Sequence, residues 1–167
     1  MHKIFLSKEK NKFSAAHMTV FSDGTKEQLH GHNFGVTVSL EVKSIDFEHF
    51  IDFGIIKNTI EQLCSRWDHR LLLAEKNAYY KAIRNDGREL EFQLCGKRYT
   101  VPREDAVLLP VDNIIVETLA YQFGNDLLAQ LPSQIIAGVK SCEVTITESE
   151  GQGGVFYRAM DETSRND

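Results

Sequence analysis

The sequence predicts a single α+β domain, and three features of the chain carry this prediction. Apolar and polar residues alternate from 34 to 43, which is typical of a strand with one buried face. Residues 54–66 and 116–131 instead repeat apolar side chains at helical spacing. A length of 167 residues suits one domain with a real core, which we expect at 1–160, with a flexible polar tail at 161–167.

The elements are expected in the order strand, strand, helix, hairpin, helix, strand, strand. The first strand lies around residues 4–13. Asp52 stands where it can cap the first helix, and Asn113 where it can cap the second. Pro132 ends the second helix, because a proline cannot continue the helical hydrogen bonding.

The remaining elements lie in an insert and near the C-terminal end. Residues 90–94 alternate, a Cys-Gly turn follows, and 97–101 return, so the charged segment 75–107 is predicted to carry a hairpin inserted into the core fold. Alternation from 142 to 147, a glycine-rich turn and an apolar stretch at 155–160 predict two final strands.

Composition limits the classes of function. Hydrophobic residues make up 42% and charged residues 26%, as in a soluble globular domain. The net charge of -5, without a block of Lys and Arg, argues against binding nucleic acid. No apolar run approaches the roughly 20 residues that span a bilayer, and the N-terminus lacks a signal-peptide pattern. The separated Cys64, Cys95 and Cys142 form no CxxC motif and fit reduced thiols in a cytoplasmic protein.

Three histidines are candidates for a metal site. His30 and His32 are two residues apart, so in an extended chain they share a face, which is the buried face of the strand that follows. His17 ends the segment 13–17. Three imidazoles with an open fourth position are typical of catalytic zinc, which acidifies a bound oxygen near neutral pH. The alternative is that these are ordinary core or surface histidines.

Four further polar residues stand out by position. Glu148 has the phase of the buried residues of its strand, where a carboxylate is costly unless paired or functional; alternatively, the strand has frayed there. Asp68 and His69 follow the first helix, either as a polar pair at a helix end or as catalytic groups. Glu117 lies in the first turn of the second helix, where the helix dipole favours a carboxylate in any case.

Six segments resemble, in the same order, the family of 6-pyruvoyl-tetrahydropterin synthases and 6-carboxytetrahydropterin synthases. They are FSAAH (13–17), LHGHNF (29–34), IDFGIIK (51–57), WDHRLL (67–72), VETLA (116–120) and ITESEGQGGVFY (146–157). The resemblance covers nearly the whole chain except the insert. It implies a tunnelling fold, in which subunits pool their strands into a barrel, and a homohexamer with active sites between subunits. It also implies 7,8-dihydroneopterin triphosphate as the substrate.

The same resemblance implies roles for the candidate residues. The three histidines hold zinc, which grips the side-chain hydroxyls of the substrate. Asp68 and His69 form a proton relay, and Glu148 anchors the pterin ring; Glu117 is the weakest candidate, as a second substrate-binding residue. A carboxylate suits the pterin, because it accepts two hydrogen bonds from an amino-pyrimidinone edge.

The chain departs from the family at the catalytic cysteine, which usually stands shortly before the HGH motif. The loop FSDGTKEQLHGH has no cysteine, but Glu27 lies three residues before His30. This ExxHGH pattern resembles a branch that cleaves the dihydropterin side chain to 6-hydroxymethyl-7,8-dihydropterin for folate synthesis. A carboxylate base beside a zinc-polarised hydroxyl can open a carbon–carbon bond, so Glu27 is a catalytic candidate; the alternative is an ordinary loop residue.

We therefore expect a zinc-dependent lyase that acts on 7,8-dihydroneopterin triphosphate, with side-chain cleavage as the first candidate reaction. The alternatives are 6-carboxytetrahydropterin, as in deazapurine and queuosine synthesis, or 6-pyruvoyl-tetrahydropterin as the product. A protein that binds pterin without catalysis is a further alternative, motivated by the missing cysteine. Relatives commonly carry hydroxyl residues at the positions of Ile114, Ile115 and Val116. The apolar side chains of this chain cannot hydrogen-bond to a pterin, so only the backbone groups of these residues can do so.

Overall fold

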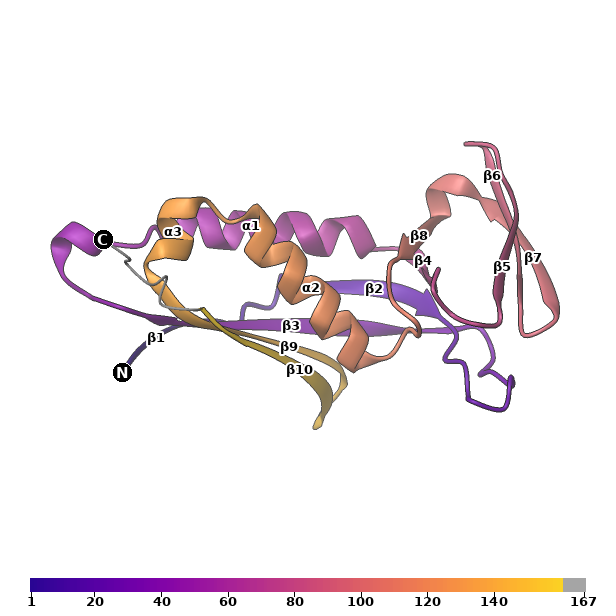
Figure 1. Cartoon of the computed structure of the whole chain (residues 1–167), viewed down its shortest axis with the longest axis horizontal. Helices are drawn as coiled ribbons and strands as arrows, with labels where there is room; N and C mark the ends of the chain where they lie inside the picture. The colour runs from indigo at the N-terminus through magenta and orange to yellow at the C-terminus, as the bar shows by residue number, and fades with distance from the viewer. Residues whose placement is uncertain (161–167) are drawn as a thin grey trace, which may run out of the picture.

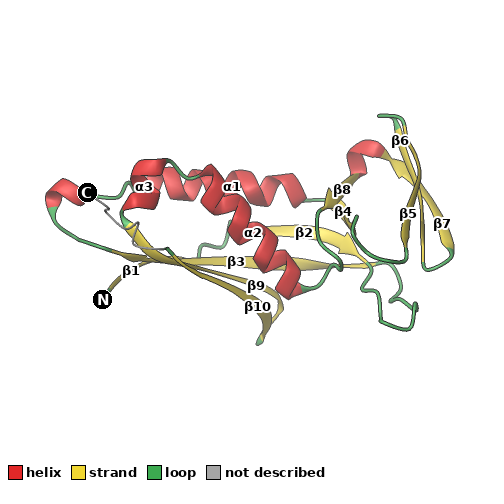
Figure 2. Ribbon diagram, viewed as in Figure 1, coloured by secondary structure: helices red, strands yellow, loops and turns green. Residues whose placement is uncertain are grey.

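The chain forms one long, curled sheet with helices on one face and a small second sheet at one end (Figure 1). Figure 2 shows the same view with helices and strands separated by colour. The computed structural model describes residues 1–160, apart from the side chain of His49, so the expected tail at 161–167 lies outside the described residues. The predicted α+β fold class is confirmed.

The main sheet has seven strands within residues 1–160, in the order β10-β9-β3-β2-β4-β8, with β1 also paired to β3. These are β1 (His2–Leu6), β2 (Lys12–His17), β3 (His30–Val42), β4 (Arg70–Ala74), β8 (Ala106–Leu109), β9 (Val139–Ser149) and β10 (Gln152–Ala159). The long strand β3 is central, because β9 pairs antiparallel along one side, and β1 and β2 pair antiparallel along the other. Strands β4 and β8 extend the sheet beyond β2 in parallel pairing.

Two long helices cover one face of the main sheet (Figure 1). They are α1 (Phe53–Trp67) and α2 (Val116–Gln130). The shorter helical segments are α3 (Ser133–Ala137), which follows α2, and 3-10 helices at Phe47–His49 and Arg103–Asp105. Phe13 and Phe34 of the sheet stack with ring centroids 5.0 Å apart. Trp67 of α1 meets Phe13 edge-on at 5.2 Å and Phe123 of α2 at 5.6 Å. These aromatic rings therefore fasten both helices to the sheet.

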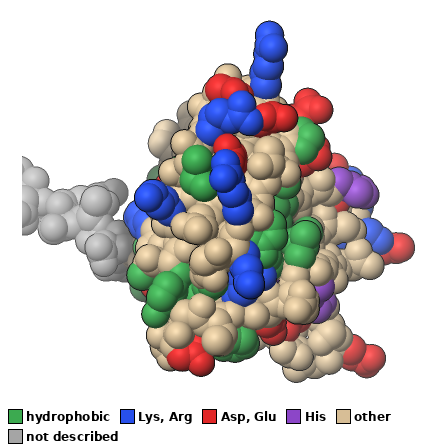
Figure 3. Space-filling view, turned by 90° about the vertical axis from the view of Figure 1, so that its right-hand side faces the viewer, with side chains coloured by type: hydrophobic (Ala, Val, Ile, Leu, Met, Phe, Trp, Pro, Cys, Tyr) green, Lys and Arg blue, Asp and Glu red, His purple; other side chains and the backbone are tan. Residues whose placement is uncertain are grey.

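The insert forms a three-stranded antiparallel sheet of its own. Its strands are β5 (Tyr80–Asn85), β6 (Glu89–Leu94) and β7 (Lys97–Pro102). The predicted hairpin corresponds to β6 and β7, and β5 adds a third strand that the sequence pattern did not reveal. Buried residues of β6 join Leu71 and Leu73 of β4 in a second hydrophobic cluster. Seen from this end, Lys and Arg side chains lie over the outer surface, with acidic ones among them (Figure 3).

The N-terminal segment differs from the prediction of one strand around 4–13. Strands β1 and β2 are separate, and between them Asn11 N donates to Lys8 O at 2.9 Å. Both strands pair with β3, β2 along its first half and β1 along its second half. Buried residues alternate with more exposed ones in both strands, so the sequence pattern did not reveal the turn that separates them.

The predicted cap of α2 is wrong. Ile115 flanks the first turn of the helix, and the hydroxyl of Thr118 accepts a hydrogen bond from Ile115 N at 3.3 Å. The Asn113 side chain instead pairs with the backbone of Val20, accepting from its N–H at 3.0 Å and donating to its carbonyl at 2.9 Å. Asn113 therefore ties the start of α2 to the loop that follows β2.

Other local predictions have mixed outcomes. Asp52 caps α1 as predicted, because its carboxylate accepts a hydrogen bond from Gly54 N at 2.7 Å. Strands β4 and β8 and helix α3 are additional elements, each of five residues or fewer and too short to show a period. None of the helices within residues 1–160 is long and apolar enough to cross a membrane.

The three cysteines are free thiols and differ in exposure. Cys64 and Cys142 are buried, and this burial raises the pKa of each thiol to about 12. Because the thiolate is the reactive form, burial disfavours both residues as nucleophiles. Cys95 is half-buried at the turn between β6 and β7.

Two glycines allow α2 to lie close to β10. A Cβ at Gly124 of α2 would lie 2.1 Å from Cδ1 of Phe156, and one at Gly154 of β10 would lie 2.6 Å from Glu117 N. Neither gap leaves room for a methyl group. The close approach fixes the first turn of α2, and with it Glu117, against the end of the sheet.

Gly124→Ala tests this packing. Alanine is the better helix former by about 1 kcal/mol, so helix propensity alone predicts a more stable protein. We expect the opposite, a loss of about 1–2 kcal/mol in the free energy of unfolding, because the new methyl group overlaps the Phe156 ring. Denaturant unfolding measures the change, and Phe156→Leu in the Gly124→Ala background should recover part of it. A more stable Gly124→Ala protein would contradict the close packing.

Candidate metal and pterin site

Three histidines meet where β2 ends and β3 begins. The antiparallel pairing places His17 directly opposite His30, and His32 opposite Ala15. The ring centroids of the three histidines are 4.6–5.3 Å apart, and one ligating nitrogen from each ring lies within 4.8 Å of the others. The structure thus brings together the three residues that the sequence predicts as metal ligands.

Backbone carbonyls orient two of these rings. Nδ1 of His17 lies 3.1 Å from the Ile114 carbonyl, and Nδ1 of His30 lies 2.7 Å from the Gln28 carbonyl. Because a carbonyl oxygen only accepts, each Nδ1 carries the proton, and the lone pair of each neutral ring is on Nε2. This is the usual arrangement around metal-ligating histidines, in which a second partner fixes the tautomer.

The Nε2 atoms are suited to a cation. Nε2 of His17 is buried and has no hydrogen-bond partner among the described residues, which is costly for a nitrogen with a free lone pair. Nε2 of His30 and Nε2 of His32 lie only 3.1 Å apart. Burial lowers the pKa of His17 and therefore favours the neutral ring that a metal requires. The donor set fits a divalent metal with three imidazole ligands.

Carboxylates surround the histidines. Oε2 of Glu27 lies 3.7 Å from Nε2 of His30, and Oε2 of Glu148 lies 4.0 Å from Nε2 of His32. Both glutamates line one cavity of about 200 Å³ together with Glu117 and the three histidines. The Glu148 side chain is only 18% exposed, and Gln152 Nε2 donates to its Oε1 at 2.5 Å. No Lys or Arg lines this cavity in the described part of the chain.

The start of α2 forms one wall of the cavity. Ile115 and Val116 line it next to Glu117. Ile114 contributes only its carbonyl, which accepts from His17 and also from the Thr19 hydroxyl at 3.4 Å. Sequence reasoning missed the carbonyls that hold His17 and His30, because a backbone group carries no mark of its own in a sequence.

Asp68 and His69 lie apart from this cavity. One oxygen of Asp68 accepts from Ser14 N at 2.7 Å, and the other lies 2.8 Å from Nδ1 of His69. His69 has a left-handed backbone, with φ at 55°, and its N–H donates to Ser14 O at 2.6 Å. Its side chain is 79% exposed and faces a different, larger cavity of about 600 Å³, which His32 also lines. Within one chain, the pair is oriented but does not reach the cavity of the three histidines.

Comparison with known proteins agrees with this geometry. The sequence model of the family described as 6-pyruvoyl tetrahydropterin synthase matches residues 6–159. A Methanocaldococcus jannaschii protein assigned as a 6-carboxy-5,6,7,8-tetrahydropterin synthase is 33% identical over 152 residues, which is 90% of this chain and 91% of the relative. A Pyrococcus horikoshii protein with the same assignment is 25% identical over 134 residues, 80% of this chain and 78% of the relative.

The fold is shared with solved structures. The 6-pyruvoyl tetrahydropterin synthase of Plasmodium vivax matches with a TM-score of 0.87 at 24% identity, covering 95% of this chain and 98% of the other. A variant of that enzyme in which a catalytic glutamate is replaced by alanine matches with a TM-score of 0.86. The match of the family model across residues 6–159 and the shared tunnelling fold lead to one conclusion: the chain belongs to the 6-pyruvoyl tetrahydropterin synthase family.

Proposed function

We propose that the protein is a zinc-dependent lyase that converts 7,8-dihydroneopterin triphosphate to 6-hydroxymethyl-7,8-dihydropterin by cleaving the side chain. The observation that carries this proposal is the Glu27 carboxylate, 3.7 Å from a candidate metal ligand. No cysteine competes for that role, because Cys64 and Cys142 are buried and Cys95 lines a different cavity. A glutamate is also a catalytic residue in the Plasmodium vivax relative.

The three histidines would hold the zinc ion, and Glu27 and Glu148 line the same cavity. Zinc, when bound, polarises a substrate hydroxyl and makes its proton easier to remove. The Ile114 carbonyl keeps His17 in the tautomer that binds metal. The proposal of zinc over other divalent metals rests on the set of three imidazoles without sulfur.

Glu148 would hold the pterin ring. Its carboxylate accepts hydrogen bonds, and an amino-pyrimidinone edge offers two parallel donors. The carboxylate is half-buried, and the hydrogen bond from Gln152 fixes its orientation. Glu117 lines the same cavity and is the second candidate for a substrate contact. Since no Lys or Arg of the described residues lines the cavity, the phosphates of the substrate would lie outside it.

Glu27 would act as the base. It accepts the proton of the C2′ hydroxyl, and the bond between C1′ and C2′ breaks. C2′ then leaves as an aldehyde that carries the phosphates, and the electron pair stays on C1′, conjugated with the pterin. A proton delivered to C1′ completes 6-hydroxymethyl-7,8-dihydropterin. General base catalysis of this kind contributes about 10²–10⁴-fold to a rate.

Asp68 and His69 would deliver the proton from a neighbouring subunit. Within one chain they lie outside the cavity, but the His69 ring is held by Asp68 and is 79% exposed, as a group that serves another copy should be. Under this proposal the active sites would lie at contacts between subunits, as in the homohexamer that the family resemblance implies.

A second candidate function is 6-carboxytetrahydropterin synthesis. It is favoured by the assignment of the Methanocaldococcus jannaschii relative, which is 33% identical along nearly its full length. The same groups would act on the same substrate, so the two functions differ in their product. Formation of 6-pyruvoyl-tetrahydropterin is the remaining family reaction, and binding without turnover is the outcome if Glu27 has no catalytic part.

Glu27→Gln tests the role of the base. We expect turnover of 7,8-dihydroneopterin triphosphate to fall by about 10²–10³-fold, because the amide cannot take a proton, while the zinc content stays the same. Mass spectrometry of the products measures the rate and tells 6-hydroxymethyl-7,8-dihydropterin from the carboxy and pyruvoyl products. Glu9→Gln is the control, because the Glu9 side chain is 96% exposed. Full turnover by Glu27→Gln would remove the basis of the proposal.

Mixing two inactive variants tests the shared site. Glu27→Gln and His69→Ala would each be inactive alone. If the two residues act in one site but come from different subunits, unfolding and refolding the two variants together should restore roughly a quarter of the wild-type rate, the share of sites that combine two intact halves by chance. The same variants mixed without subunit exchange provide the control. A refolded mixture that stays inactive would place both residues of each site in one subunit.

A further inference from the structure

The first residues of the loop that carries Glu27 pack against the small sheet. The loop spans residues 18–29 and joins β2 to β3. Met18 and Val20 at its start are buried in the second hydrophobic cluster. The buried residues that the small sheet contributes to this cluster are Leu90, Phe92 and Leu94 of β6. The base of the loop is therefore packed against the insert.

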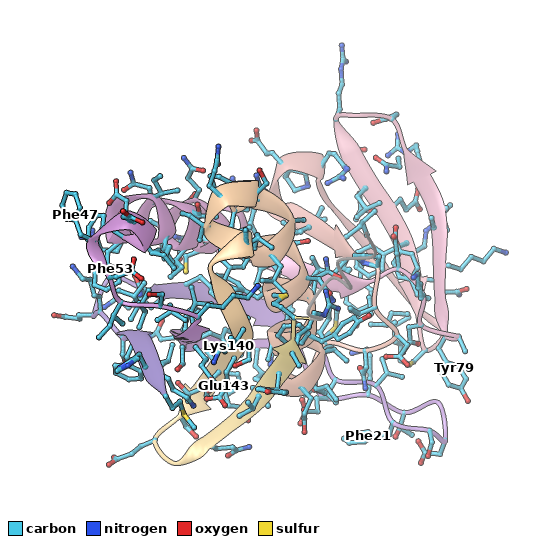
Figure 4. The ribbon with its side chains drawn as sticks, turned by 60° about the vertical axis from the view of Figure 1, so that its left-hand side comes forward. Phe21, Phe47, Phe53, Tyr79, Lys140 and Glu143 are labelled. Carbon is cyan, nitrogen blue, oxygen red and sulfur yellow. The ribbon has the colours of Figure 1, made fainter. Side chains whose placement is uncertain are left out.

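The tip of the loop also contacts the small sheet. The hydroxyl of Tyr79, next to β5, donates to Ser22 O at 3.2 Å. Its ring lies so close to Gly24 that a Cβ there would be 2.9 Å from Cε1, and Gly24 has a φ of +82° that favours glycine. Figure 4 shows the Tyr79 side chain pointing from the end of the small sheet toward the loop that carries Phe21. The Cys95 thiol lies 3.9 Å from Thr25 O.

A chain of contacts runs from the small sheet to the backbone of Glu27. The Tyr99 ring of β7 stacks on Phe92 of β6, with centroids 5.1 Å apart and planes 12° from parallel. The ammonium of Lys26 lies over the Tyr99 ring, 5.4 Å from its centroid, and donates to Glu27 O at 3.1 Å. On the other side of the loop, Glu27 N donates to Thr19 O at 2.9 Å. Both backbone groups of Glu27 are therefore held.

Lys26 and Glu27 face different cavities. Lys26 lines the cavity between the loop and the small sheet, together with Cys95 and Tyr99, while Glu27 lines the cavity of the three histidines. Neighbouring residues of an extended segment point to opposite sides, so fixing one side chain also fixes the direction of the next. The contacts that hold Lys26 therefore also fix the direction in which the Glu27 carboxylate points.

We propose that the small sheet β5–β6–β7 is a positioning device for Glu27, and that Tyr99 is a positioning residue that acts through Lys26. This inference rests on the proposed function, because it assigns the device to a catalytic Glu27. Backbone hydrogen bonds within the loop, from Phe21 N to Thr25 O and from Glu27 N to Thr19 O, close the loop on itself, and the contacts with the small sheet fix its position from outside. Misplacing a catalytic group by about 1 Å can lower a rate by about 10²-fold, so the device affects the chemical step directly.

The test uses the full-length, zinc-loaded protein and two matched pairs of variants. Tyr99→Leu removes the aromatic face below Lys26, whereas Tyr99→Phe keeps it. Lys26→Met removes the ammonium, whereas Lys97→Met removes an exposed ammonium that lines the same cavity and has no ion pair among the described residues. The readouts are amide hydrogen exchange at Glu27, zinc content, and kcat and KM with 7,8-dihydroneopterin triphosphate.

We expect Tyr99→Leu and Lys26→Met to speed exchange at the Glu27 amide. Each should also lower kcat by about 10-fold, because without the cation–aromatic contact the Glu27 carboxylate is no longer held in place. KM should stay within about twofold, because pterin binding depends on Glu148, and the zinc content should not change. Tyr99→Phe and Lys97→Met should resemble the wild type in all four readouts.

A double-mutant cycle shows whether Tyr99 acts through Glu27. In the Glu27→Gln background, Tyr99→Leu should cause no further fall in the residual rate. An equal fall in both backgrounds, or unchanged exchange at the Glu27 amide in Tyr99→Leu, would overturn the inference. Failure of the proposed function is recognised separately, as full turnover by Glu27→Gln with an intact Tyr99, and amide exchange then still decides whether the sheet holds the loop.

Discussion

The antiparallel pairing of β2 with β3 is the constraint on which the site depends. It places His17 opposite His30, and the two-residue period of β3 brings His32 to the same face. A slip of one residue would turn His30 and His32 to the other face and separate them from His17. The register is held by the core, because Phe13 and Phe34 of the same two strands stack at 5.0 Å in the buried layer. The packing that stabilises the fold therefore also sets the positions of the three histidines proposed to bind metal.

Helix α2 and the small sheet supply the remaining contacts that position the three histidines and the Glu27 loop. The segment before α2 supplies the carbonyl of Ile114 to His17, and Asn113 ties that segment to Val20 at the base of the Glu27 loop. Glycines at the contact with β10 let α2 approach closely enough to bring Glu117 to the cavity. On the other side, the small sheet contacts the loop from Met18 to Lys26. Segments that are distant in the sequence thus contact the Glu27 loop and the three histidines.

The sequence predicts the parts of this structure that show a period or a motif. The alternation of β3 and the helical spacing of α1 and α2 identified the central strand and both long helices, and the three histidines expected to bind metal do lie together. Short elements such as β4 and β8 were missed, because four or five residues do not define a period. The capping role expected of Asn113 was wrong. An asparagine side chain can hydrogen-bond to the first turn of a helix or to a distant backbone segment, and the fold brings the Val20 backbone within reach. The positions of Asp68 and His69, outside the cavity, could not be predicted because that cavity is built by pairing and packing over long distances in the sequence.

The metal site is the central claim, and X-ray absorption spectroscopy at the zinc edge of the zinc-loaded protein tests it most directly. The account predicts three imidazole nitrogens at about 2.0–2.1 Å, one further light ligand and no sulfur, with this signal lost in His17→Ala and kept in His69→Ala. A sulfur ligand, or a signal that is unchanged in His17→Ala, would show that zinc binds elsewhere and would contradict the site described for these strands.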